Sequence, residues 1–214
     1  MKNTESKAEI VAEYGPFDGV EHVHGVTFDG ERVWFAFGAG MLAFDPRTKK
    51  ETKRLDVAAD AGTAFDGKHL WQLAGARIQK IDPETGNVVG SIPAPGAGKD
   101  SGLTWAEGTL WVGQYRDKKI HKIDPETGAI LRTIESDKFV TGVTWADGEL
   151  WHATIDEDQS DIRRVDQTTG EVLERLVLPK GKLIAGLEAG PDAFYAGSHE
   201  TATVRAVKRP RRVA

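Results

Sequence analysis

Short apolar stretches alternate with polar turns along most of the chain, and residues 102–134 show this pattern clearly. They divide into four segments, at 102–105, 109–113, 119–124 and 129–134. The second segment reads Thr-Leu-Trp-Val-Gly, which favours a strand, whereas Glu107-Gly108 and the Asp-Pro-Glu-Thr-Gly sequence ending at Gly128 favour tight turns. This stretch predicts a meander of four antiparallel strands.

The same pattern occurs five times. The glycines that open each copy follow one another at intervals of 37, 40, 40 and 44 residues: Gly25, Gly62, Gly102, Gly142 and Gly186. Every second strand carries an aromatic residue at the same place: Trp34, Trp71, Trp111, Trp151 and Tyr195. Repeats of this length are typical of propeller blades. We therefore predict an all-β fold, a five-bladed β-propeller with four-stranded antiparallel blades, in which most tryptophans serve the core.

The fifth copy has no fourth strand of its own. After its third strand the chain ends in Arg-Pro-Arg-Arg-Val-Ala, whereas Glu9-Ile-Val-Ala-Glu-Tyr14 near the N-terminus resembles the fourth strands of the other copies. We predict that this N-terminal strand closes the last blade, which would remove an exposed sheet edge. The predicted propeller domain spans residues 9–208, with a flexible tail over 1–8 and a flexible basic tail over 209–214.

The amino-acid composition argues against several classes of function. The 214 residues carry a net charge of −5 with acidic and basic side chains interspersed, which argues against nucleic acid as a partner. The absence of cysteine excludes disulfides, thiolate nucleophiles and zinc–thiolate sites. The N-terminus has no apolar leader, and no apolar run is long enough to span a membrane. We expect a soluble, cytoplasmic monomer that does not bind membranes.

The predicted topology sorts the loops by face. The links between blades and the loops between second and third strands lie on one face, and they are the irregular ones, so we expect a site there. The positions just before the opening glycines should circle the mouth of the axial channel: His24, Ala61, Ser101, Thr141 and Ala185. A small polar ligand at this mouth is the geometric expectation.

Departures from the repeat mark candidate functional residues. Glu188 stands on an innermost strand where the other copies have Thr or Ala, and His152 stands where they have Phe, Gln, Val and Ala. A carboxyl at such a place needs a partner or has a raised pKa. We predict Glu188, His152 and His24 as catalytic residues, with a hydrogen-bonded core histidine as the alternative for His152. The predicted ligand-binding residues are Asp100, Ser101, Gln72, Tyr115, Arg116 and His199.

Metal binding has weaker support in the sequence. His22, His24, His152, His199 and Glu188 come from neighbouring blades, but no fixed spacing joins them, so we predict no metal site. The sequence identifies no cofactor.

Two known families share features with these repeats. The motifs Ser101-Gly-Leu-Thr-Trp and Lys122-Ile-Asp-Pro-Glu-Thr-Gly128 resemble the NHL and YVTN-type propellers, including the virginiamycin B lyase group. The blade count and Ala185-Gly-Leu-Glu188 resemble the glutamine cyclotransferase family. That resemblance implies a role for Glu188, whereas Ser101 stands where the family has its acid/base glutamate. It also implies a hydrolase, lyase or cyclotransferase-like enzyme, and the alternative is a non-catalytic scaffold that binds a protein partner.

Overall fold

The computed structural model describes residues 4–198 and 200–210, and the regular structure within them is β-sheet. Each blade is a separate antiparallel sheet of four repeat strands. Blade 1 contains β3 (Val26–Phe28), β4 (Val33–Ala36), β5 (Met41–Asp45) and β6 (Lys50–Leu55). Blade 2 contains β7 (Thr63–Phe65), β8 (Leu70–Ala74), β9 (Arg77–Ile81) and β10 (Val88–Pro93). Blade 3 contains β11 (Asp100–Ala106), β12 (Thr109–Gln114), β13 (Lys119–Ile123) and β14 (Ile130–Glu135).

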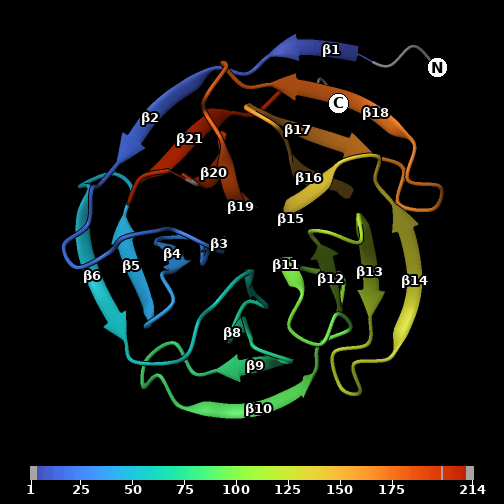
Figure 1. The fold of residues 1–214 in the computed structure, drawn as a ribbon. Coiled ribbons are helices and arrows are strands. Elements are labelled where there is room, and N and C mark those ends of the chain that lie inside the picture. The colour runs from blue at the N-terminus through green and yellow to red at the C-terminus, as the bar shows by residue number, and fades with distance from the viewer. Residues whose placement is uncertain (1–3, 199, 211–214) are drawn as a thin grey trace.

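The last two blades include strands from the N-terminal segment. Blade 4 contains β15 (Phe139–Ala146), β16 (Glu149–Asp156), β17 (Gln159–Val165) and β18 (Val172–Val177), with β1 (Thr4–Lys7) beside β18. Blade 5 contains β19 (Ile184–Ala189), β20 (Ala193–Ser198), β21 (Val204–Lys208) and β2 (Ile10–Tyr14). Figure 1 shows the first strand of each blade near the centre and the fourth on the perimeter. The predicted five-bladed β-propeller is confirmed.

The predicted closure of blade 5 is also confirmed. Strand β2 pairs antiparallel with β21, and the register places Ile10 opposite Val207 and Tyr14 opposite Val204. The first and last strands of the propeller ring therefore share one sheet, so the N-terminal strand completes the ring.

The prediction of a flexible tail over residues 1–8 is wrong for residues 4–7. Strand β1 pairs in parallel with β18 of blade 4, and the Glu5 carboxylate accepts a hydrogen bond from Arg175 at 2.9 Å. The N-terminal segment thus adds a strand to the edge of blade 4 before it completes blade 5, as Figure 1 shows at the top of the ring. Residues 1–3 lie outside the described part of the chain.

The predicted basic tail likewise begins with an ordered residue. The Arg209 amide donates to the Asp192 carbonyl at 3.0 Å, and its guanidinium pairs with Asp147 of blade 4 and lies over the Phe194 ring. Arg209 therefore ties blade 5 to blade 4, whereas residues 211–214 lie outside the described residues.

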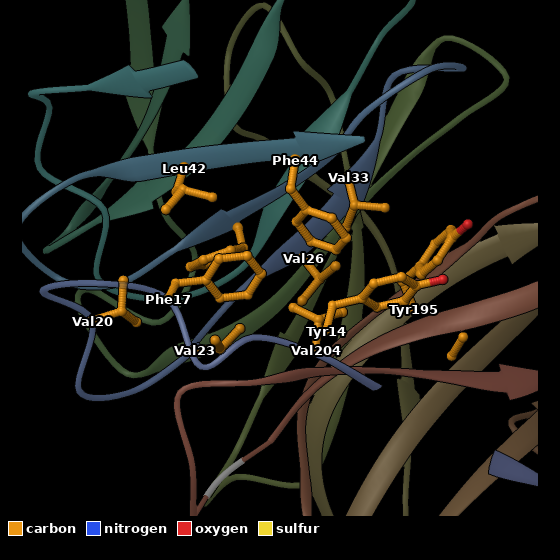
Figure 2. Packing of buried hydrophobic residues seen from close by; sticks show 12 residues of the cluster. Tyr14, Phe17, Val20, Val23, Val26, Val33, Leu42, Phe44, Tyr195 and Val204 are labelled. Atoms are coloured by element: carbon orange, nitrogen blue, oxygen red, sulfur yellow. The ribbon is translucent and has the colours of Figure 1, made fainter. Parts of the chain in front are cut away.

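The core lies between neighbouring blades. Figure 2 shows the cluster between blades 5 and 1, where Tyr14 and Tyr195 of blade 5 meet Phe44 of blade 1. Ring centroids of Tyr14 and Phe44 are 4.9 Å apart, and those of Phe17 and Phe35 are 4.8 Å apart. Burial of such side chains stabilises each interface by roughly 1.5–3 kcal/mol per residue.

The aspartates of the first turns fasten the tryptophans. Asp29 accepts hydrogen bonds from Trp34 Nε1 at 2.7 Å and from the Arg32 amide at 2.7 Å, so one carboxylate holds both the turn and the indole. Asp66 does the same for Trp71 Nε1 at 2.8 Å. Burial alone would raise the pKa of Asp29, but these hydrogen bonds lower it below its ordinary value. Both tryptophans therefore have a structural role.

The innermost strands meet at a ring formed by the five opening glycines. A Cβ atom on Gly142 would lie 2.5 Å from both the Gly186 carbonyl carbon and the Leu187 amide nitrogen of the next blade. A Cβ atom on Gly62 would lie 2.5 Å from the Leu103 amide nitrogen, and each of the other three glycines likewise faces backbone of the following blade. Only hydrogen side chains fit at this distance, which explains why each repeat opens with glycine.

Candidate functional site

The five predicted rim positions lie around one cavity of about 250 Å³, which we call the rim cavity. Residues of all five blades line it: His24, Asp60, Ala61, Asp100, Ser101, Tyr115, Thr141, Ile155, Ala185 and Gly186. The five residues that precede the glycine ring are among them, because every first strand begins at this face. Four of the predicted site residues, namely His24, Asp100, Ser101 and Tyr115, therefore come together here.

Asp100 is a titratable residue of this cavity, and its pKa is shifted. Its carboxylate accepts hydrogen bonds from the Gly96 amide at 3.0 Å and from Gln114 Nε2 at 3.3 Å. Burial nevertheless raises the pKa of Asp100 above its ordinary value, because the desolvation outweighs these two donors. A fixed carboxyl group with this property can take up and release a proton at higher pH than an exposed aspartate.

A second carboxylate, Asp60, lies on the same rim. Its Oδ2 atom accepts a hydrogen bond from the Gly75 amide at 2.7 Å, while the residue as a whole remains exposed. The sequence places Asp60 next to the rim position Ala61 but gives it no role. The structure adds it to the cavity, which then carries two acidic side chains.

The hydroxyl group of Ser101 is directed to the backbone. Ser101 Oγ lies 2.7 Å from the Val140 carbonyl oxygen and 3.1 Å from the Gly113 carbonyl oxygen, so its single proton is shared between these acceptors. Ser101 therefore joins blade 3 to blade 4 and is not arranged as a nucleophile. Its oxygen lone pairs are the part that a ligand can use.

Thr141 and Ile155, together with Tyr115 from the neighbouring blade 3, form the blade 4 side of the cavity. The Thr141 hydroxyl is buried, and no hydrogen-bond partner for it exists among the described residues. Tyr115 stacks on Phe139 with ring centroids 4.8 Å apart, and the buried Ile155 lies nearby in the wall. This side thus offers an apolar surface and one unsatisfied hydroxyl group.

Glu188 lies outside the rim cavity, two residues beyond Gly186 of the glycine ring. Blades 4, 5 and 1 enclose its carboxyl, which accepts hydrogen bonds from Thr144 Oγ1 at 3.0 Å, Thr27 Oγ1 at 3.1 Å and the Ala189 amide at 2.9 Å. Burial raises the pKa of Glu188 to about 7, and these hydrogen bonds oppose the shift. Glu188 therefore has both hydrogen-bond partners and a raised pKa.

His152 is a core residue. It is 2 % exposed, and its Nδ1 atom has no hydrogen-bond partner within the described residues. Burial and the charge of Arg163 lower its pKa to about 4, so the ring is neutral. The single site predicted from Glu188, His152 and His24 is therefore not formed, since His24 alone of the three lines the rim cavity.

The remaining predicted residues take other places. Gln72 is fully buried and pairs with Thr63 Oγ1 at 2.6 Å and with the Leu73 carbonyl at 2.8 Å, which is a structural role. Arg116 is exposed and does not line the rim cavity, and His199 lies outside the described residues. Across residues 4–198 and 200–210, no three His, Asp or Glu side chains are grouped so that they could hold a metal ion.

Blade 4 contains a buried ionic network that was not predicted from the sequence. Arg163 and Asp161 are 2 % and 1 % exposed and pair at 2.7 Å, while Arg175 reaches the same aspartate at 2.8 Å. Arg163 also pairs with Asp137 in the link between blades 3 and 4. Arg163 was a weak signal, because the corresponding positions of the other blades read Leu42, Gln79, His121 and Arg205. The network pairs the buried charges with one another and holds β18, the strand with which β1 pairs, against its neighbours.

The sequence matches no model of a known protein family and no curated protein. Solved structures do share its fold. Glutaminyl cyclase from Myxococcus xanthus superposes with a TM-score of 0.78 at 14% identity, over 97% of this chain and 98% of that one. Virginiamycin B lyase from Staphylococcus aureus gives a TM-score of 0.53 at 14% identity, over 88% of this chain and 66% of that one. The resemblance to both groups is thereby confirmed for the propeller fold.

No helix among the described residues is long and apolar enough to cross a membrane.

Proposed function

We propose that this propeller binds a small polar ligand in the rim cavity and that Asp100 transfers a proton to or from it. The observation that carries this proposal is the position of Asp100, a carboxyl with a raised pKa in a cavity lined by all five blades. Cavities of this kind, with few polar groups and a perturbed titratable residue, are where ligands bind and proton transfer occurs in proteins.

The position of Asp100 also suggests how the chemistry differs from that of the glutamine cyclotransferases. Ser101 occupies the place of their acid/base glutamate, and its proton is bound to backbone carbonyls. The carboxyl group of this cavity stands one residue earlier in the chain. Asp100, held by Gly96 and Gln114, is therefore the group that we assign to proton transfer.

The similarity in fold to two enzymes supports the proposal that this propeller is itself an enzyme. The two structures named above are, by their names, a glutaminyl cyclase and a lyase, so propellers with this architecture carry out reactions on small groups. General acid/base catalysis by Asp100 suits either reaction class, since both need one proton removed and one supplied.

Thermal stabilisation by ligands tests the proposal. Wild type and Asp100→Asn are screened against small amines, amides, sugars and hydroxy acids, with Asp56→Asn as the control because Asp56 is an exposed aspartate that does not line the cavity. We expect compounds that raise the Tm of wild type and of Asp56→Asn but not of Asp100→Asn. A glutaminyl peptide is included, because its cyclisation would release measurable ammonia. A screen in which no compound distinguishes wild type from Asp100→Asn would contradict the proposal.

A further inference from the structure

A smaller cleft adjoins the rim cavity. It has a volume of about 130 Å³ and lies between blades 2 and 3, where Leu73, Gly75 and Gly98 form its inner walls. Asp60, Ala61 and Asp100 line both spaces, so these three residues mark the junction between them. From this arrangement we infer that the site binds a secondary ammonium group at the junction, with one substituent in each space. The inference rests on the proposed function, because it names the ligand class of that same cavity.

The charges at the junction favour a cation. Asp60 receives one hydrogen bond from the Gly75 amide, and Asp100 receives its hydrogen bonds from Gly96 and Gln114, all of them uncharged donors. Among the described residues, no Lys or Arg lines either space. A carboxylate accepts about four hydrogen bonds, so both groups keep acceptor capacity. Asp60 is exposed, but Asp100 is half-buried, and a half-buried anion without a cationic partner is costly, so a bound cation offsets that cost.

The geometry distinguishes between kinds of amine. A secondary ammonium has two N–H donors and two substituents, which match two carboxylates and two spaces. A primary ammonium has only one substituent and leaves one space empty, whereas a neutral ether of the same shape has no donor for Asp60 or Asp100. The larger substituent belongs in the rim cavity and the shorter one in the cleft, since the volumes are about 250 and about 130 Å³.

The blade 4 side of the rim cavity indicates which chemical groups the larger substituent should carry. Ile155 and Tyr115, whose ring stacks on Phe139 behind it, provide an apolar wall for an aromatic or aliphatic group. The Thr141 hydroxyl on this side is buried and lacks a hydrogen-bond partner among the described residues, which is a second and independent feature of the cavity. A buried polar group without a hydrogen bond is unfavourable, so a ligand atom that supplies one gains affinity.

Calorimetric titration with three related probes tests the inference: N-ethylbenzylamine, benzylamine, which lacks the second substituent, and benzyl ethyl ether, which lacks the charge. We expect N-ethylbenzylamine to bind about tenfold more tightly than each of the other two, as expected for a charge-assisted hydrogen bond and a filled second space. Asp60→Asn should weaken the binding of N-ethylbenzylamine about tenfold and leave that of the ether unchanged. Asp56→Asn should behave as wild type, and circular dichroism of each variant verifies that it is folded.

The outcomes separate this inference from the proposed function. Three results would each contradict the inference of a secondary ammonium ligand. They are benzylamine binding as tightly as N-ethylbenzylamine, the ether binding as tightly as N-ethylbenzylamine, and no binding of N-ethylbenzylamine. If benzylamine binds as well as N-ethylbenzylamine and both lose affinity in Asp100→Asn, the proposed function stands without it. If compounds from the wider screen bind but none depends on Asp100, the proposed function itself fails.

Discussion

The ring of opening glycines makes a sharp prediction for the Gly142→Ala variant. The added methyl carbon would lie 2.5 Å from the Gly186 carbonyl carbon and the Leu187 amide nitrogen, whereas ordinary contact begins at 3.4 Å. The strands β15 and β19 would have to separate by about 0.9 Å at this point. Neither obstacle is a flexible side chain, so the movement must displace backbone in blade 5.

The expected cost follows from this displacement. Overpacking in a well-filled core costs typically 1–3 kcal/mol, and a backbone obstacle within a closed ring belongs at the upper end, at about 3 kcal/mol. For a chain of this size, such a loss lowers the Tm by roughly 6–12 °C. Urea denaturation followed by tryptophan fluorescence measures the free energy of unfolding, and calorimetry measures the Tm.

Gly90→Ala is the matched control. Gly90 lies in the outer strand β10, and a Cβ atom there would meet only the Lys80 side chain, at 3.9 Å. This variant should stay within about 0.5 kcal/mol of wild type, as is usual for an unobstructed surface change. If Gly142→Ala were as stable as Gly90→Ala, the close approach of the inner strands would not be what requires glycine.

Three further predictions concern titration and the N-terminal strands. Because the pKa of Glu188 is about 7 in the fold against 4.5 for the free group, its contribution to stability is lost as pH rises between these values. Glu188→Gln should therefore gain stability relative to wild type from pH 5 to pH 8 in urea denaturation, and parallel pH profiles would contradict this. The pKa of His152 is about 4 against 6.5, so its contribution is lost as pH falls from 6.5 to 4. His152→Phe should reduce that acid sensitivity, and an unchanged acid midpoint would count against a buried neutral ring. Deletion of residues 1–7 removes only the exposed β1 and should leave a folded protein with a lower Tm, whereas deletion of residues 1–14 also opens blade 5 and should give aggregated or unfolded protein. Size-exclusion chromatography distinguishes folded from aggregated protein. If the variant without residues 1–14 were monodisperse, the closure of blade 5 by β2 would be refuted.

The fold was predictable because the sequence repeats itself. The opening glycines and the second-strand aromatics fix the blade count, and the missing fourth strand of the last copy requires a substitute, which Ile10–Tyr14 provides. Strand β1 was not predictable in this way. Its residues Thr4–Lys7 are polar and all exposed, so no alternation marks them, and it is held by backbone pairing with β18 and the ion pair of Glu5 with Arg175.

The location of the candidate site could be predicted from the sequence better than the residues that form it. Topology placed His24, Ser101 and Thr141 at one face, and all three line the rim cavity. Glu188 and His152 stood out as departures from the repeat, but a departure does not tell which side of the glycine ring a residue occupies or whether it faces another blade. Those relations depend on contacts between strands that lie far apart in the sequence, such as the hydrogen bond from Thr27 to Glu188.

The sharing of blade 5 between the two ends of the chain has a consequence during synthesis. Strand β2 leaves the ribosome before the strands of blades 1 to 4, whereas its antiparallel partner β21 is made after all of them. Domains made from the N-terminus onward can form early contacts as they appear, and blades 1 to 3 have all their strands in sequence order. The ring can close only after β21 has been made, so β2 must wait with an unpaired edge while blades 1 to 4 are made.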